Sequence, residues 1–149
     1  MKGFILGALL LLSNTSFSQW ILENVDNGFD DPYKICYSEP SKNVVMKLEN
    51  VEGKIVFYLS NGYFCDKETS VDISFLVAGF YKKYTVMGQV SSNAKSIFLT
   101  WDLVNVEFIE DFKSAGAVKI RVNESYCSTD IYQFSMNNSK KALDFVLSE

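Results

Sequence analysis

The chain has 149 residues, of which 48% are apolar and 21% are charged, a balance that supports one domain with a hydrophobic core. It contains no histidine, which excludes the Ser-His-Asp triad, the Cys-His pair and every histidine-ligated zinc site. Its formal net charge of -4 would repel a phosphate backbone, so we expect no nucleic-acid partner. We also expect no cofactor.

The amino-terminal segment has the three parts of an export signal. Lys2 supplies a positive charge, residues 4–12 form an apolar stretch, and residues 16–18 have the small-x-small pattern of a cleavage point. We expect cleavage after Ser18, with Gln19 as the alternative. The apolar stretch is well short of the roughly 20 residues that span a bilayer, and no later run is long enough, so we expect no transmembrane segment after leader removal. The protein should then be periplasmic or secreted.

Apolar and polar residues alternate along most of the remaining chain, a pattern typical of strands that bury one face. We therefore expect a cleaved signal peptide over residues 1–18 and a single β-rich domain over residues 19–149. Asn61-Gly62 predicts a hairpin turn that pairs residues 63–65 with the preceding strand, and Gly79 divides a second hairpin. The runs with strand character are 20–22, 33–37, 44–48, 54–59, 63–65, 71–78, 81–90, 97–102, 118–123 and 131–136.

Two segments depart from this alternation and predict helices. Between about Asn105 and Ala115, apolar residues recur at helical spacing, and Gly116 is placed to end the helix. Between Ser139 and Leu147, a second apolar stripe has the same spacing. About eight short strands and two short helices predict a mainly β fold, either an antiparallel β-sandwich or a partly open barrel, with the helices over an end or an open edge.

The three cysteines would lie in an oxidising compartment after export. Because their number is odd, at most one internal bridge forms. We favour Cys65 with Cys127, since each ends a strand-like run beside turn residues, and this pairing leaves Cys36 as a leftover thiol. A different pairing and a chain without a bridge are the alternatives. In the chain-entropy model the favoured bridge stabilises the fold by about 4 kcal/mol.

Aromatic residues make up 15% of the chain and suggest a binding surface. If Tyr58, Tyr63, Tyr81 and Tyr84 reach the outer face of the sheet, their rings form a platform for a glycan or an anchor patch for a protein. The competing interpretation places these tyrosines in the core or in cross-strand pairs. The alternation alone leaves both interpretations open.

A short acidic segment near the amino terminus is a weak candidate for a metal site. Asp26, Asp30 and Asp31 surround Gly28 and offer the oxygen ligands that calcium prefers. The spacing is not that of an EF-hand loop. We interpret the segment as a polar turn, with calcium as the weaker alternative, and otherwise expect no metal.

A second group of carboxylates gathers around the first predicted helix. Paired carboxylates perform general acid and base catalysis in glycosidases. The same residues equally describe a solvated helix face. The acids concerned are Asp102, Glu107, Glu110 and Asp111.

The C-terminal third has a distinctive order of elements. A helix precedes the alternating strand of residues 117–123, then come Cys127, a strand that reaches Met136, and a short helix that contains alanine and leucine. This layout resembles the end of the invasion-associated locus B family of exported bacterial β-sandwich proteins. The resemblance implies a β-sandwich in the periplasm, and no functional residue of the family is carried over.

These patterns favour a small exported non-enzymatic protein that binds a protein or a cell-envelope component. The binding element would be a sheet face bearing tyrosines or an exposed edge strand. One alternative is a carbohydrate-binding or adhesin-like module, and a third is a secreted hydrolase that uses carboxylates alone. A protein or a glycan is therefore the expected partner.

Overall fold

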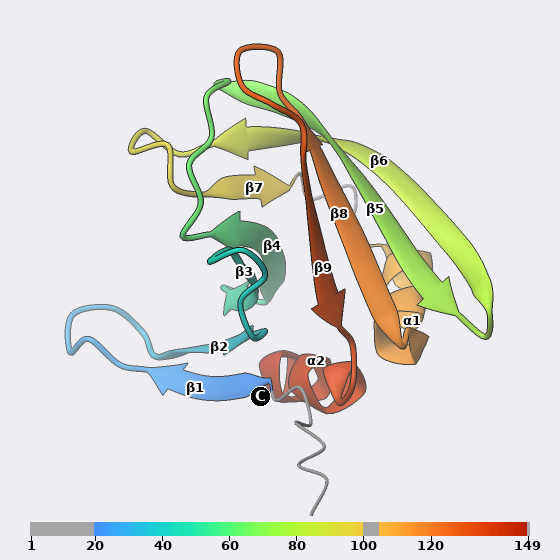
Figure 1. Cartoon of the computed structure of the whole chain (residues 1–149). Coiled ribbons are helices and arrows are strands. Elements are labelled where there is room, and N and C mark those ends of the chain that lie inside the picture. Colours follow the sequence, from blue (N-terminus) through green and yellow to red (C-terminus); the bar gives the residue numbers. More distant parts are fainter. Residues whose placement is uncertain (1–19, 100–104, 149) are drawn as a thin grey trace, which may run out of the picture.

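The computed structural model describes residues 20–99 and 105–148 (Figure 1). The predicted signal peptide, the cleavage point and Asp102 lie outside these residues. The elements in chain order are β1 (Ile21–Val25), β2 (Tyr33–Tyr37), β3 (Val45–Val51), β4 (Lys54–Ser60), β5 (Glu68–Val77), β6 (Phe80–Val90), β7 (Ile97–Leu99), α1 (Val106–Ser114), β8 (Ala117–Asn123), β9 (Asp130–Ser135) and α2 (Ser139–Leu147).

All strands belong to one antiparallel sheet in the order β1-β2-β3-β4-β7-β6-β5-β8-β9. The mainly β, antiparallel class with two short helices is therefore confirmed, and the architecture is one continuous sheet that is not closed into a barrel. The three-residue strand β7 joins the half formed by β1 to β4 to the half formed by the longer strands. Figure 1 shows the second half crossing steeply over the first, with both helices on the concave side.

The edge strand β9 reaches the connection between β2 and β3 without pairing to it as a strand. The backbone N–H of Gln133 donates to Ser41 Oγ at 3.0 Å. The Lys42 ammonium lies 3.7 Å from the Asp130 carboxylate, and both side chains are substantially exposed. These contacts bring the second half of the sheet back toward the first, so the loops at this end converge.

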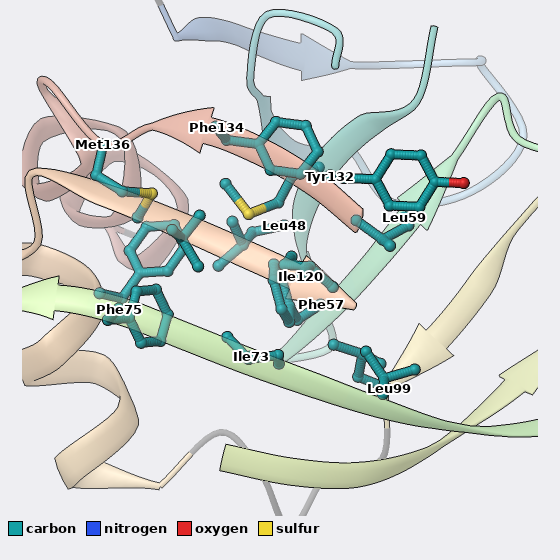
Figure 2. Packing of buried hydrophobic residues seen from close by; sticks show 14 of the residues in the cluster. Leu48, Phe57, Leu59, Ile73, Phe75, Leu99, Ile120, Tyr132, Phe134 and Met136 are labelled. Atoms are coloured by element: carbon teal, nitrogen blue, oxygen red, sulfur yellow. The ribbon is translucent and has the colours of Figure 1, made fainter. Parts of the chain in front are cut away.

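Period-two alternation builds the core on the concave face of this sheet. Phe57 of β4, Ile73 and Phe75 of β5 and Ile120 of β8 are each fully buried. Figure 2 shows these side chains converging from strands that are far apart in sequence. The core is thus shared by both halves of the sheet, and neither half has an apolar interior of its own.

The first helix supplies the aromatic side chains that fill the space between the halves. Asn105 caps α1 by accepting a hydrogen bond from the backbone N–H of Phe108 at 2.9 Å. The ring centroid of Phe108 is 5.5 Å from that of Phe57 and 5.3 Å from that of Phe75. The predicted helix is confirmed; it ends at Ser114, with Ala115 as its C-cap.

The second helix has the predicted bounds, Ser139–Leu147. Its N-cap Asn138 is left-handed with a φ of 67° and makes no side-chain capping bond. The Ser139 hydroxyl instead donates to the backbone carbonyl of Phe112 in α1 at 2.8 Å, which ties the two helices together. Among residues 20–99 and 105–148, neither helix has the length and apolar character needed to cross a membrane.

The predicted hairpin at Asn61-Gly62 is wrong. The backbone N–H of Gly62 donates to Lys95, and that of Phe64 donates to Ala94, both in the connection between β6 and β7. Asn61 has the left-handed backbone expected of the dipeptide, but Phe64 is drawn into the core and the chain does not return along β4. Two-residue turns do join paired strands at 52–53, between β3 and β4, and at the predicted break 78–79, between β5 and β6.

The outer face of β5 carries a polar network around Asp72. Its carboxylate accepts hydrogen bonds from Asn123 at 3.0 Å, from Arg121 at 2.6 Å and from Thr85 at 2.8 Å. The bond from Asn123 and then those from Arg121 and Thr85 lower the pKa of Asp72 to about 2. The network joins β5, β6 and β8 on the solvent side of the sheet.

We expect Gly88→Ala to destabilise the fold by about 1–3 kcal/mol, because the new methyl group overpacks the core. A Cβ at Gly88 would lie 2.4 Å from Ile97 Cγ2 and 3.1 Å from Val71 Cγ2. Gly116→Ala is the matched control, since a Cβ there meets nothing within 4 Å. Urea unfolding of both variants measures the difference, and equal stabilities would contradict the packing described for β6 and β7.

We expect the Asp72 network to contribute about 1 kcal/mol at neutral pH, after allowance for solvent screening. Because the pKa of Asp72 is lower in the folded protein than its ordinary value of 3.8, this contribution is present above about pH 4 and is lost as the pH falls toward 2. Asp72→Asn should therefore reduce stability at pH 7 but have little effect near pH 2. Thermal unfolding of Asp72→Asn across this pH range, with the exposed substitution Asp31→Asn as control, measures the difference in stability from wild type. A difference that grows as the pH falls would contradict the prediction.

Candidate functional site

A disulfide joins two loops at one end of the sheet. Cys65 in the β4–β5 connection is bonded to Cys127 in the β8–β9 connection, with a Cα–Cα distance of 5.9 Å, which confirms the favoured pairing. Cys36 is free, as predicted, and is buried on β2. Burial raises the pKa of the Cys36 thiol to about 12, so it is not a reactive group in the folded protein.

Two carboxylates reinforce this disulfide by binding the backbone of the opposite loop. Glu124 Oε1 accepts from the backbone N–H groups of Cys65 and Asp66, the latter at 3.2 Å. In return the buried carboxylate of Asp66 accepts from the backbone N–H groups of Ser125 at 2.7 Å and Tyr126 at 3.3 Å. Hydrogen bonds to ionised acceptors are stronger than neutral ones, so the two loops are held in a defined relative position. We call this arrangement the disulfide clamp.

A cavity of about 500 Å³ lies against the disulfide clamp, and we call it the clamp groove. Tyr63 lines it with a side chain that is 74% exposed, whereas Tyr132 is buried. Figure 2 shows the Tyr132 ring at one side of the core, with its hydroxyl directed away from the cluster. The lining residues are Lys42, Asn43, Val44, Asn61, Gly62, Tyr63, Glu124, Cys127, Ser128, Asp130 and Tyr132.

Charges of both signs lie around the clamp groove. Burial, followed by the carboxylates of Asp130 and Glu124, raises the pKa of Tyr132 to about 12, so the phenol stays neutral. The Lys42 ammonium lies 6.0 Å from the centroid of the Tyr132 ring and also pairs with Asp130. The groove therefore offers hydrogen-bond donors and acceptors beside two aromatic rings.

The groove is built in part from residues in the left-handed backbone region. Lys42 and Asn43 form a two-residue turn with φ values of 49° and 70°, closed by the bridge between Ser41 and Val44. Asn61, in the β4–β5 connection, also lines the groove and has a φ of 63°. Asparagine tolerates this conformation, whereas for lysine it is uncommon, and such positions often occur at functional sites.

The four tyrosines predicted as a binding surface are not brought together. Tyr58 is buried on the outer face between neighbouring strands, and Tyr81 is exposed on that face. Tyr84 is directed to the concave face, where its hydroxyl donates to Asp111 Oδ2 at 2.6 Å. Tyr63 alone of the four lines the clamp groove. Burial raises the pKa of Tyr58 and of Tyr84, and each is further raised by the carboxylate that it binds, Glu49 and Asp111 respectively.

In the acidic segment that was the weak candidate for calcium, side-chain oxygens accept hydrogen bonds from groups of the same turn. Asp26 Oδ1 accepts from the backbone N–H of Gly28 at 2.9 Å, and Asp30 Oδ2 accepts from Asn27 Nδ2 at 3.0 Å. In the described part of the chain, the carboxylates of Asp26, Asp30 and Asp31 do not gather within 4.8 Å of one another. The geometry is that of a self-bonded polar turn.

A different group has ligand atoms close enough for a metal ion. Within residues 20–99 and 105–148, Cys65, Glu124 and Cys127 bring ligand atoms within 4.8 Å of one another. The two sulfurs are bonded to each other, however, and metal binding by cysteine requires thiolates. In the oxidised protein this group is therefore a covalent link between loops.

The carboxylates around α1 do not form one cluster in the described residues. Glu107 and Glu110 are exposed on the helix surface. Asp111 is buried and accepts the hydrogen bond from Tyr84. Asp102 lies outside the described residues.

The residues that shape the groove were mostly missed by the sequence reasoning. For Glu124, the only feature of the sequence that points to the site is its proximity to Cys127. Lys42 and Asn43 lie outside the alternating runs, so no pattern in the sequence points to them. The chain matches no family model, no curated protein and no solved structure. The layout shared with the invasion-associated locus B family therefore stays a prediction.

We expect Glu124→Gln to destabilise the protein by about 1–2 kcal/mol, because it replaces two charge-assisted bonds with neutral ones. Glu68→Gln is the matched control, since this exposed glutamate of β5 accepts a hydrogen bond from the Gln89 side chain and lies outside the clamp. Replacing both Cys65 and Cys127 with serine should cost up to about 4 kcal/mol. Chemical unfolding distinguishes the variants, and equal effects at Glu124 and Glu68 would show that the carboxylate does not support the clamp.

Proposed function

We propose that the protein is an exported, non-enzymatic binding module that holds a segment of a protein or a cell-envelope component in the clamp groove. The observation that carries this proposal is the position of Tyr63, whose ring is 74% exposed at a groove whose walls are held by a disulfide and reciprocal carboxylates. Exposed tyrosines bind partners at a low cost in conformational entropy. Rigid walls lower the ordering cost further.

The chemistry around the groove supports binding over catalysis. Histidine, the most frequent general base, does not occur in the chain. The Glu124 carboxylate is occupied by two backbone N–H groups, and Asp130 is paired with Lys42.

Export is the natural setting for this proposal. The disulfide joins two loops of the fold, and disulfides persist in oxidising compartments. The amino-terminal pattern of a charge, an apolar stretch and small residues is of the kind that directs a chain there. Both observations support a periplasmic or secreted protein.

A glycan is the second candidate ligand. The groove combines the exposed Tyr63 ring with the side-chain amides of Asn43 and Asn61. A sugar presents apolar C–H groups that pack on an aromatic ring and hydroxyl groups that pair with amides. The volume of the clamp groove, about 500 Å³, is within the range of small-ligand pockets.

We expect Tyr63→Ala to weaken ligand binding at least tenfold, because it removes the aromatic wall without touching the core. Tyr126→Ala is the matched control: this residue is 89% exposed on the adjoining loop and does not line the groove. Immobilised wild type and both variants would be presented with envelope extract and with a glycan array.

A ligand retained by wild type and Tyr126→Ala but lost by Tyr63→Ala supports the proposal, and its chemistry separates the two candidates. A ligand retained equally by all three proteins would mean that the groove is not the binding site. Unfolding curves for each variant show whether a loss of binding reflects a loss of fold.

A further inference from the structure

The edge strand β1 has backbone hydrogen-bonding groups that point away from the sheet. The backbone N–H of Ser38 donates to Met46 at 2.9 Å, so the even-numbered residues of β2 pair with β3 and the odd-numbered residues pair with β1. The register of β1 on β2 is unbroken, so the odd-numbered residues of β1 face β2. The backbone N–H and C=O groups of Leu22 and Asn24 are therefore directed outward, where the described part of the chain offers them no partner.

The opposite edge of the sheet is covered, whereas the edge formed by β1 is open. At β9, Ser41 Oγ accepts from the backbone N–H of Gln133, and Lys42 lies against Asp130. No hydrogen bond or ion pair of the described residues covers the outer edge of β1 in this way. The strand also contains no proline, lysine or bulge, the features by which edge strands commonly avoid further pairing. Figure 1 shows β1 at the margin of the sheet, so its edge is accessible to another strand.

The side chains of β1 determine what an added strand must carry. Leu22 packs against the core on the concave face, so Glu23 lies on the outer face, where it is exposed. In the described part of the chain Glu23 has no ion-pair partner. Residues 20–33 contain four acidic residues and neither lysine nor arginine. Because directly opposed side chains of neighbouring strands contact each other, a complementary strand carries a basic residue opposite Glu23 and an apolar residue opposite Leu22.

A second copy of the chain does not meet this requirement. Two β1 strands use all of their outward groups when they pair antiparallel, with Leu22 of each strand opposite Asn24 of the other. That register places Glu23 directly opposite the Glu23 of the second copy. Like charges at directly opposed positions destabilise a strand pair, and the acidic residues that follow β1 add to the repulsion. The charge of this edge therefore favours a different protein as its partner.

We propose that β1 binds an extended basic segment of another protein, which joins the sheet as an additional antiparallel strand. The main chain of this segment pairs with the backbone groups of Leu22 and Asn24. Its lysine or arginine faces Glu23 on the outer face, and the residues on either side of that cation face the concave side. This surface is independent of the function proposed for the clamp groove, because no residue of β1 lines the groove.

The test titrates the purified protein with two peptides, acetyl-Thr-Val-Lys-Val-Thr-amide and the same peptide with glutamate in place of lysine. NMR amide shifts measure binding, and hydrogen exchange at the amides of Leu22 and Asn24 reports whether the outward groups become paired. We expect saturable binding of the lysine peptide, slower exchange at both amides, and an affinity about fivefold above that of the glutamate peptide, the size of one cross-strand charge pair. The lack of saturable binding, or binding without protection of these amides, would overturn the proposal.

Three variants connect the binding to this edge. Glu23→Lys should reverse the preference between the two peptides, because it reverses the charge that the central residue faces. Asn24→Pro should abolish binding of both peptides, because proline removes an outward N–H and none that β2 uses. Asn24→Ala is its matched control and should bind like wild type, since it keeps the backbone N–H. An unchanged preference in Glu23→Lys contradicts the proposal, as does a dimer of the protein alone, seen by sedimentation, that Asn24→Pro abolishes.

Discussion

The fold depends on covering the concave face of a single open sheet. An isolated sheet has no second sheet to bury its apolar face, so another element must do so. Here Phe108 of α1 contacts Phe57 in one half of the sheet and Phe75 in the other. Aromatic pairs of this kind contribute about 0.5–1.5 kcal/mol each beyond their buried area. Phe112 continues the cluster to Trp20, at 5.5 Å between ring centroids, and so reaches the first edge of the sheet.

The short strand β7 is the junction between the two halves of the sheet. It contributes two paired positions to β4 and three to β6, and through these the hydrogen bonding of the sheet passes from one half to the other. The lack of a side chain at Gly88 leaves room for the side chains of Ile97 and Val71 at this point. A narrow junction between two longer halves permits the strong curvature that brings β9 near the β2–β3 connection. The clamp groove lies where those loops meet, so it is a product of the curvature.

Local patterns were sufficient to predict the features that depend on neighbouring residues. The alternation and the apolar stripe predicted β2 and α2 with their observed bounds, and adjacent turn residues predicted the bridge between Cys65 and Cys127. The alternation also implied that Tyr81 and Tyr84, three positions apart on one strand, must face opposite sides of the sheet. The prediction of one surface containing both residues is therefore inconsistent with the alternation of β6.

Features that depend on distant segments could not be read from local patterns. The turn at Asn61-Gly62 was wrong because the partner of the following residues is the loop between β6 and β7, some thirty positions later. The clamp groove combines three connections, and the strand order that brings them together has no signature in any one of them. The burial of Tyr58 likewise arises from Phe98, whose ring centroid lies 5.1 Å away on a strand that is adjacent only in the folded sheet.

The position of Cys36 bears on how the correct disulfide is selected during oxidative folding. Three thiols allow three pairings, and a single pairing matches the native loops. Cys36 lies on a strand that pairs with the next strand in the chain, whereas Cys65 and Cys127 are 62 positions apart. Short-range pairs form with less loss of chain entropy than long-range pairs. In the folded protein Cys36 is buried in the core, so thiol–disulfide exchange has only Cys65 and Cys127 to join.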